Sequence, residues 1–162
     1  MTSPSDNSET QTASLRAQIS VYRAATQQFV DVASSLASDD LDRQPAEPDG
    51  WTPRMVVHHM ADSHLNMYVR IKLALTEDEP TVKPYDENAW ATLPDGPVEL
   101  SLQLIEAVHG RVVPLLQTLE DQHFDRRYDH PELLRTVPIR EVVQMYAWHG
   151  DHHLAHIQLP TL

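Results

Sequence analysis

The last long helical pattern of the chain reads PIREVVQMYAWHGDHHLAHIQ, residues 138–158. Spacings of three and four residues place one set of side chains on a single helix face; the set comprises Ile139, Val142, Tyr146, His149, His153 and His156. This apolar stripe should face the protein interior, and buried imidazoles need polar partners. His149 and His153, at i and i+4, can share one metal ion. The alternative is that these histidines are ordinary polar residues at a helix C-terminus, where the helix dipole favours them.

A second histidine pair, His58-His59, lies roughly ninety residues earlier, on another predicted helix. That helix should begin at Thr52, a good N-cap followed by Pro53, and end at about residue 75. Adjacent residues on a helix point about 100° apart, so only one histidine of the pair can face a given site. We predict that His59 is the third metal ligand.

His59 shares its helix face with four polar side chains, Asp62, Ser63, Asn66 and Arg70. The stripe is either solvated or the wall of a cleft, and its short polar groups favour the cleft. Asp62 and Asn66 are candidates for orienting the imidazoles. His64, on the opposite apolar face, is predicted to be a core histidine, and His109, His123 and His130 have no partner at ligand spacing.

The periodicity predicts an all-α fold, a four-helix bundle of antiparallel type with long connecting loops. Its helices should span about 15–37, 52–75, 98–119 and 138–158, with Pro114 kinking or breaking the third helix. No strand alternation is visible. Residues 1–13 are polar and predicted to be a disordered tail, which leaves residues 14–162 as one domain. The Pro-rich segment 80–97 is long for a loop and suggests a lid or a dimer contact.

Composition narrows the possible partners. The 162 residues carry a formal net charge of −12, which disfavours nucleic acid and anionic membrane surfaces. There is no cysteine, so the chain supplies neither a thiol nucleophile nor a thiolate ligand. The N-terminal segment lacks the apolar core of a secretory signal, and no apolar run reaches the length of a membrane span. A cytoplasmic protein acting on a small-molecule substrate is therefore expected.

Four segments together resemble the DinB superfamily, in particular its YfiT-like branch, whose members are described as metal-dependent hydrolases. The segments are WTPRMVVHHMADSH at 51–64, PTVKPYDENAW at 80–90, YDHP at 128–131 and WHGDHHLAHI at 148–157. The resemblance implies a four-helix bundle with metal ligands at His59, His149 and His153. It also implies homodimers, bound zinc or nickel, and relatives that transfer low-molecular-weight thiols such as bacillithiol or mycothiol. Much of the wider superfamily has Gln at the position of His156.

The leading hypothesis is a metal-dependent enzyme, a hydrolase in which three imidazoles hold one divalent ion, zinc or nickel, that activates water. His156 or Asp62 would move the proton, and Arg70 with Asn66 would bind the substrate, Arg70 through a carboxylate. One alternative is a metal-dependent S-transferase of the bacillithiol or mycothiol type, with the thiol as co-substrate. Another is a non-catalytic helical bundle that binds a metal or a small ligand.

Overall fold

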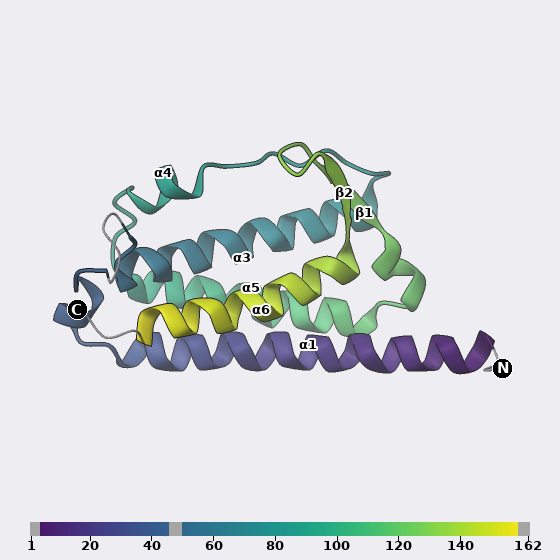
Figure 1. Ribbon diagram of the computed structural model, residues 1–162, viewed down its shortest axis with the longest axis horizontal. Helices are drawn as coiled ribbons and strands as arrows, with labels where there is room; N and C mark the ends of the chain where they lie inside the picture. The colour runs from purple at the N-terminus through teal and green to yellow at the C-terminus, as the bar shows by residue number, and fades with distance from the viewer. Residues whose placement is uncertain (1–3, 46–49, 159–162) are drawn as a thin grey trace.

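The computed structural model describes residues 4–45 and 50–158, and four long helices make up most of it (Figure 1). They are α1 (Pro4–Ser35), α3 (Pro53–Thr76), α5 (Val98–Thr118) and α6 (Ile139–Gln158). The predicted all-α four-helix bundle is confirmed. Within the described part of the chain, no helix is both long and apolar enough to cross a membrane. The first three residues of the predicted tail, part of the loop before residue 50 and the last four residues of the predicted domain lie outside the described residues.

The helices do not all alternate in direction. One apolar cluster joins the first half of α1 and the start of α6 to the second halves of α3 and α5, and a second cluster joins the opposite ends. Hence α1 and α6 run parallel to each other and antiparallel to α3 and α5 (Figure 1). The prediction of an antiparallel bundle is wrong for the successive pair α3 and α5. Their connection, residues 77–97, is long enough to return along α3, which spans about 36 Å.

Smaller elements fill the connections that were predicted to be loops. They are α2 (Ser38–Leu41), α4 (Glu87–Ala91), the 3-10 helix η1 (Asp121–Asp125), and two strands, β1 (Arg127–His130) and β2 (Arg135–Pro138). The strands pair antiparallel, with Tyr128 opposite Val137. The prediction that the chain has no strand is therefore wrong. Each strand has only four residues, too few to show alternation, and each is stabilised by its partner rather than by its own sequence.

The connection after α3 is held to the hairpin by backbone hydrogen bonds. The N–H of Val82 donates to the carbonyl of Asp129 (3.0 Å), and the N–H of Asp129 donates to the carbonyl of Pro80 (3.0 Å). At the other end of the hairpin, the N–H of Ile139 donates to the carbonyl of Arg126 (2.9 Å). These bonds place the segment that follows Pro80 beside the start of α6.

The start of α1 differs from the prediction, and at Pro114 the structure excludes one of the two predicted effects, a break in the helix. α1 begins at Pro4, so the predicted disordered tail is helical from that residue onward. Proline fits the first turn of a helix, and each residue added to an existing helix contributes one hydrogen bond, so the packed part from Leu15 can extend toward the N-terminus. α5 continues through Pro114 without a break. α3 begins as predicted, because the Thr52 hydroxyl accepts a hydrogen bond from the N–H of Met55 (3.3 Å).

Polar side chains lie between the two apolar clusters. On α3, Ser63 and His64 separate the stretch up to Ala61, which belongs to one cluster, from Met67 onward, which belongs to the other. On α5 and α6, His109 and His149 occupy the corresponding places. The bundle therefore contains a belt of imidazoles at mid-height, enclosed by apolar packing above and below.

Two helical glycines provide a matched test of how closely α6 packs on α1. A Cβ atom on Gly150 would lie 3.1 Å from the Cβ of Ala25, whereas one on Gly110 would meet nothing within 4 Å. Gly110→Ala is expected to raise the free energy of unfolding by about 0.5–1 kcal/mol, the usual gain from replacing glycine inside a helix. Gly150→Ala should show no such gain, because its methyl group overpacks the contact. Urea denaturation of both variants measures the difference, and equal gains would contradict the close contact.

Candidate metal centre

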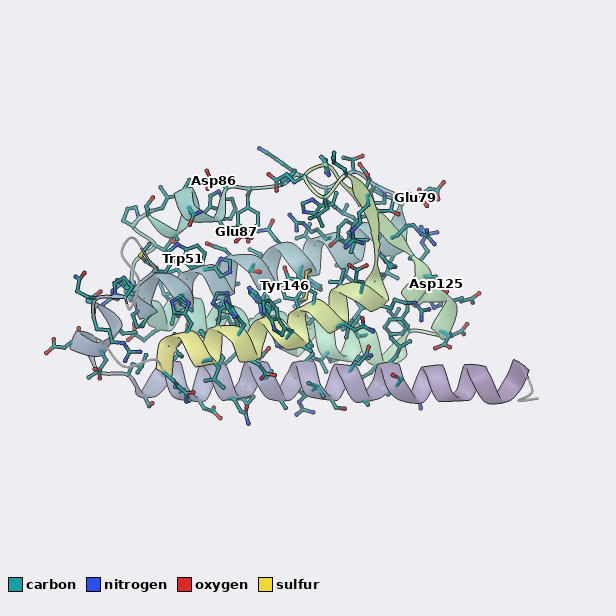
Figure 2. The ribbon with its side chains drawn as sticks, in the orientation of Figure 1. Trp51, Glu79, Asp86, Glu87, Asp125 and Tyr146 are labelled. Carbon is teal, nitrogen blue, oxygen red and sulfur yellow. The ribbon has the colours of Figure 1, made fainter. Side chains whose placement is uncertain are left out.

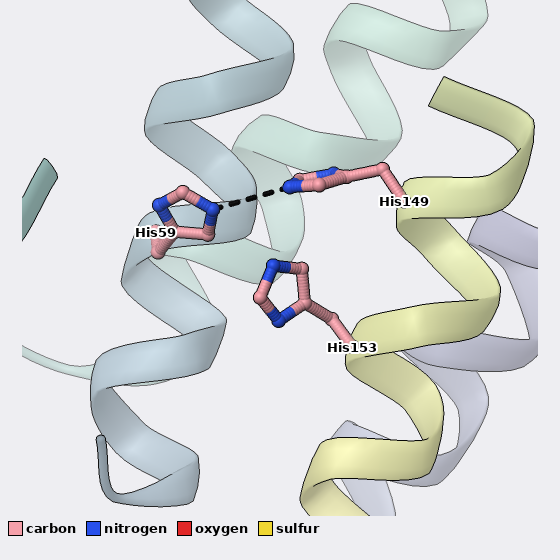
Figure 3. Close-up of side chains that lie close together, drawn as sticks. All are labelled: His59, His149 and His153. Atoms are coloured by element: carbon pink, nitrogen blue, oxygen red, sulfur yellow. Dashed lines mark hydrogen bonds between the residues drawn. The ribbon is translucent and has the colours of Figure 1, made fainter. Parts of the chain in front are cut away.

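Three histidines from two helices converge on one point in the belt (Figure 3). His59 comes from α3, and His149 and His153 come from successive turns of α6. The Nε2 atoms of His59 and His149 are 3.1 Å apart. One nitrogen from each of the three rings lies within 4.8 Å of the others. The sequence predicted this grouping, and the structure brings the three residues together.

Burial keeps all three imidazoles neutral. It lowers the pKa of His59 to about 4, that of His149 to about 3 and that of His153 to about 2, and neighbouring histidines lower each pKa further. Neutral imidazole is the form that binds a metal ion. These residues therefore do not need to lose a proton at neutral pH before they coordinate.

The donor set fits a divalent cation. In His149 the nitrogen that faces His59 is Nε2, whereas the buried Nδ1 atoms of His149 and His153 have no hydrogen-bond partner among the described residues. Two imidazole nitrogens bound to one ion at about 2.1 Å would be about 3–3.5 Å apart, close to the separation found between His59 and His149. Lone pairs on the nitrogen atoms of neighbouring imidazoles point toward one another here, and a cation bound between the rings would give these lone pairs a favourable partner.

Trp51 covers one side of this centre. Its ring centroid lies 4.6 Å from that of His59 and 6.3 Å from that of His153, and it stacks nearly parallel to the latter ring. The indole N–H donates to the side-chain oxygen of Asn88 on α4 (3.1 Å). The long connection between α3 and α5 is therefore in contact with the residue that shields the histidines from solvent.

The other belt histidines form a separate network. His64 is fully buried, and its Nδ1 lies 2.6 Å from Nε2 of His109, which is 2.8 Å from the hydroxyl of Tyr22. His64 is thus the core histidine that was predicted, although its Nε2 has no partner among the described residues. His109, for which no partner was predicted, is bonded across the bundle. His58 points elsewhere and pairs with the hydroxyl of Ser101 (2.8 Å).

A pocket of about 250 Å³ opens beside His149. Ser63, Tyr146 and His149 line it at the metal centre, and residues of the α3–α5 connection and of the hairpin line the rest. Figure 2 shows Tyr146 between the helices and Glu87 on the connection across from it. A larger cavity of about 400 Å³ lies between α1 and α5 but contains none of the three converging histidines. Of these two cavities, the smaller one is therefore the one that reaches the candidate metal centre.

The residues predicted to serve catalysis and substrate binding separate in space. His156 lies next to the centre, with its ring centroid 5.9 Å from that of His153. Arg70 lines the pocket. Asp62 lines a different hollow, with His58 and Asp95. The Asn66 amide donates to the carbonyl of Asp62 one turn earlier on α3 (2.9 Å). Asn66 is not among the residues that line the pocket beside His149.

Sequence reasoning missed several residues around the centre. Trp51 was given no role beyond its place in the segment 51–64 that carries the family resemblance, and Tyr146 was counted only as part of the apolar stripe. Tyr146 donates its O–H to the carbonyl of Ser63 (3.1 Å), and the Ser63 hydroxyl donates to the Tyr146 oxygen (3.1 Å). The hairpin residues Tyr128 and His130 also line the pocket. Helix periodicity does not mark them, because they reach the site through strand pairing; only the resemblance of the YDHP segment at 128–131 includes them.

A four-helix bundle with three converging imidazoles defines a class of metal-binding helical proteins. Residues 22–157 match the model of the DinB superfamily, and the chain belongs to that family. A protein of Bacillus cereus (strain 03BB102) that is provisionally named a metal-dependent hydrolase is 47% identical over 139 residues, which cover 81% of this chain and 80% of the relative. A relative from Oceanobacillus iheyensis with the same provisional description is 53% identical over 110 residues, 67% of this chain and 63% of its own length.

Solved structures show the same fold. YfiT from Bacillus subtilis, described as a probable metal-dependent hydrolase with an unusual four-helix bundle topology, superposes with a TM-score of 0.83 at 40% identity, covering 88% of this chain and 83% of YfiT. The mycothiol-dependent maleylpyruvate isomerase superposes with a TM-score of 0.71 at 18% identity, covering 91% of this chain and 62% of the isomerase. The second likeness concerns the fold alone.

Proposed function

We propose that this protein is a hydrolase that depends on one divalent metal ion, zinc or nickel, held by His59, His149 and His153. The observation that carries the proposal is the convergence of three neutral imidazoles, those of His59 and His153 buried and that of His149 half-buried, with one nitrogen of each ring within 4.8 Å of the others. A bound ion with three protein ligands keeps open positions, and there it supplies Lewis acidity and lowers the pKa of water. The names of the relatives agree with this class of activity.

The surrounding residues have separate roles in this proposal. Trp51 and the apolar clusters exclude bulk water from the histidines, which strengthens electrostatic interactions within the site. Tyr146 packs against the His149 ring, with centroids 5.3 Å apart, and restricts the orientation of that ring. Of the two predicted proton carriers, we retain His156, because it lies beside His153, whereas Asp62 lines another hollow.

Transfer of a low-molecular-weight thiol is the second candidate. The same open positions bind a thiolate as well as water, and the chain has no cysteine, so the thiol would have to come from a co-substrate. The predicted homodimer also stays a prediction, and the segment that contains α4 is its proposed contact or a lid.

Metal removal tests the proposal. Protein purified without a nickel column is expected to contain about one equivalent of divalent metal. Hydrolysis of a panel of small esters and amides should stop after dialysis against a chelator and return when zinc or nickel is added. The same preparations, offered a low-molecular-weight thiol and an electrophile, separate the two candidates by product analysis. Turnover that is insensitive to the chelator would exclude a metal-dependent mechanism of either kind.

A further inference from the structure

The pocket beside His149 has a cationic end away from the metal centre. Arg70 lies on α3 two helical turns beyond Ser63, about 10 Å along the helix axis, and both residues line the pocket. The walls of the pocket also include the apolar side chains of Val137 and Met145. The volume of about 250 Å³ is smaller than that of pockets for drug-sized molecules, about 300–1,000 Å³, so a ligand that fits here is small.

Arg70 is a half-buried cation without a carboxylate partner among the described residues. Within the described residues, the arginines that form ion pairs are Arg54, Arg127, Arg135 and Arg140. Arg70 instead donates to the carbonyl of Lys83 (3.2 Å), and its guanidinium carbon lies 6.0 Å from the centre of the Tyr85 ring. A partly desolvated charge that is paired only with neutral groups is costly to keep. The chain has a net charge of −12, yet none of the acidic side chains that the structure describes pairs with Arg70.

A second polar group points to the same kind of ligand. The buried Nδ1 of His130 has no hydrogen-bond partner among the described residues, although His130 lines the pocket with Arg70. Burial, and then the charge of Arg70, lower the pKa of His130. A neutral imidazole N–H can donate to an anion that Arg70 attracts.

The acidic residues of the pocket do not cancel this charge. The Glu141 carboxylate is paired with Arg135, and Glu87 and Glu132 are exposed at the rim. These two rim carboxylates disfavour ligands of high negative charge, such as a phosphate dianion. One planar guanidinium with one neutral donor matches a single carboxylate, which arginine binds in a bidentate manner.

We propose that the substrate is a small carboxylic acid, with its carboxylate held by Arg70 and His130 and its reacting group beside His149. The proposal rests on the proposed metal-dependent function, because it assigns the opposite end of the pocket to the reaction. The apolar walls at Val137 and Met145 would contact the part of the substrate between its two polar ends.

Binding of a matched pair of probes tests the assignment. We would measure the dissociation constants of 3-phenylpropionate and its neutral analogue 3-phenylpropanamide by ligand-observed NMR, on protein as purified and with its metal content determined. The acid should bind at least about tenfold more tightly than the amide, and Arg70→Met should remove that preference, since a hydrogen bond to a charged group is worth about 10- to 100-fold in affinity. Arg70→Lys should restore part of it. Arg140→Met, which removes an arginine already paired with Asp125, is the control and should change nothing.

The outcomes keep this inference separate from the proposed function. Arg70→Met is expected to keep the metal content of the wild type, because Arg70 is not one of the three converging histidines. If that variant binds the acid as well as the wild type does, or if acid and amide bind equally to the wild type, the carboxylate pocket is wrong even though the metal centre stands. Loss of metal in the histidine variants bears only on the metal centre.

Discussion

Replacing His153 by alanine is expected to yield a folded protein that binds its divalent metal at least about 100-fold more weakly. The loss of a residue that only orients a ligand already costs about 10- to 100-fold in metal affinity, so the loss of a ligand should cost more. His59→Ala and His149→Ala should behave alike, because each removes one of the three nitrogen atoms that lie within 4.8 Å of one another. The His59 variant keeps the two ligands on α6, whereas the other two variants keep one ligand on α3 and one on α6.

Metal content by mass spectrometry, on protein purified without a nickel column, measures this loss. The control is His152→Ala, which removes an exposed neighbour on α6 that stacks on Trp148 instead of joining the three-histidine group. Circular dichroism and thermal unfolding of the metal-free variants show whether the bundle is intact. If wild-type protein carries no metal, and takes up neither zinc nor nickel when they are added, the metal centre does not exist. The histidine belt would then have to be explained as structure or as a metal-free binding site.

Acid is expected to destabilise the metal-free protein well before most carboxylates are protonated. Burial lowers the pKa of His59 to about 4, and lowers those of His149, His109 and His153 to about 3, 3 and 2. An unfolded chain protonates histidine near pH 6.5. Below that pH the histidines of the unfolded state bind protons, whereas the buried histidines of the native state do not. The free energy of unfolding therefore falls as the pH falls.

The sign and size of this effect can be measured. Stability is lost progressively as the pH falls below 6.5, down to about pH 4 for His59, about pH 3 for His149 and His109 and about pH 2 for His153, at up to about 1.4 kcal/mol per pH unit for each group. Several such groups together would consume most of a typical stability of about 5–15 kcal/mol. Urea denaturation of chelator-treated protein at pH 7, 6 and 5 gives the slope, and His153→Gln should reduce it. A free energy of unfolding that stays constant between pH 7 and pH 5 would show that the imidazoles are not buried as described.

The local sequence was sufficient to predict features that depend on the geometry of a single helix. The i and i+4 spacing of His149 and His153, the Thr52-Pro53 start of α3, and the 100° step that favours His59 over His58 are all properties of a single helix, and the structure bears them out. Side chains on one helix have fixed relative positions, so their grouping does not depend on the rest of the fold.

How different helices and strands pack against one another could not be predicted from the local sequence. The parallel direction of α3 and α5 depends on where a long connection leads, and the hairpin exists because β1 and β2 pair with each other. Asp62 and Asn66 share a helix face with His59 by periodicity, yet Asp62 lines another hollow, and Asn66 bonds to its own helix. A helix face is broad, and neighbouring elements determine which part of it lines a cavity.

Packing between elements also determines which residues hydrogen-bond to the belt histidines and which residues surround Arg70. His64, His109 and Tyr22 come from three different helices, and Arg70 meets Tyr128 and His130 only because the hairpin folds over α3. Periodicity along α3 and along α6 therefore identified the three converging histidines of this DinB superfamily member. The packing of distant segments determined the shape and charge of the pocket beside them, because contacts between elements leave no repeating pattern in either segment.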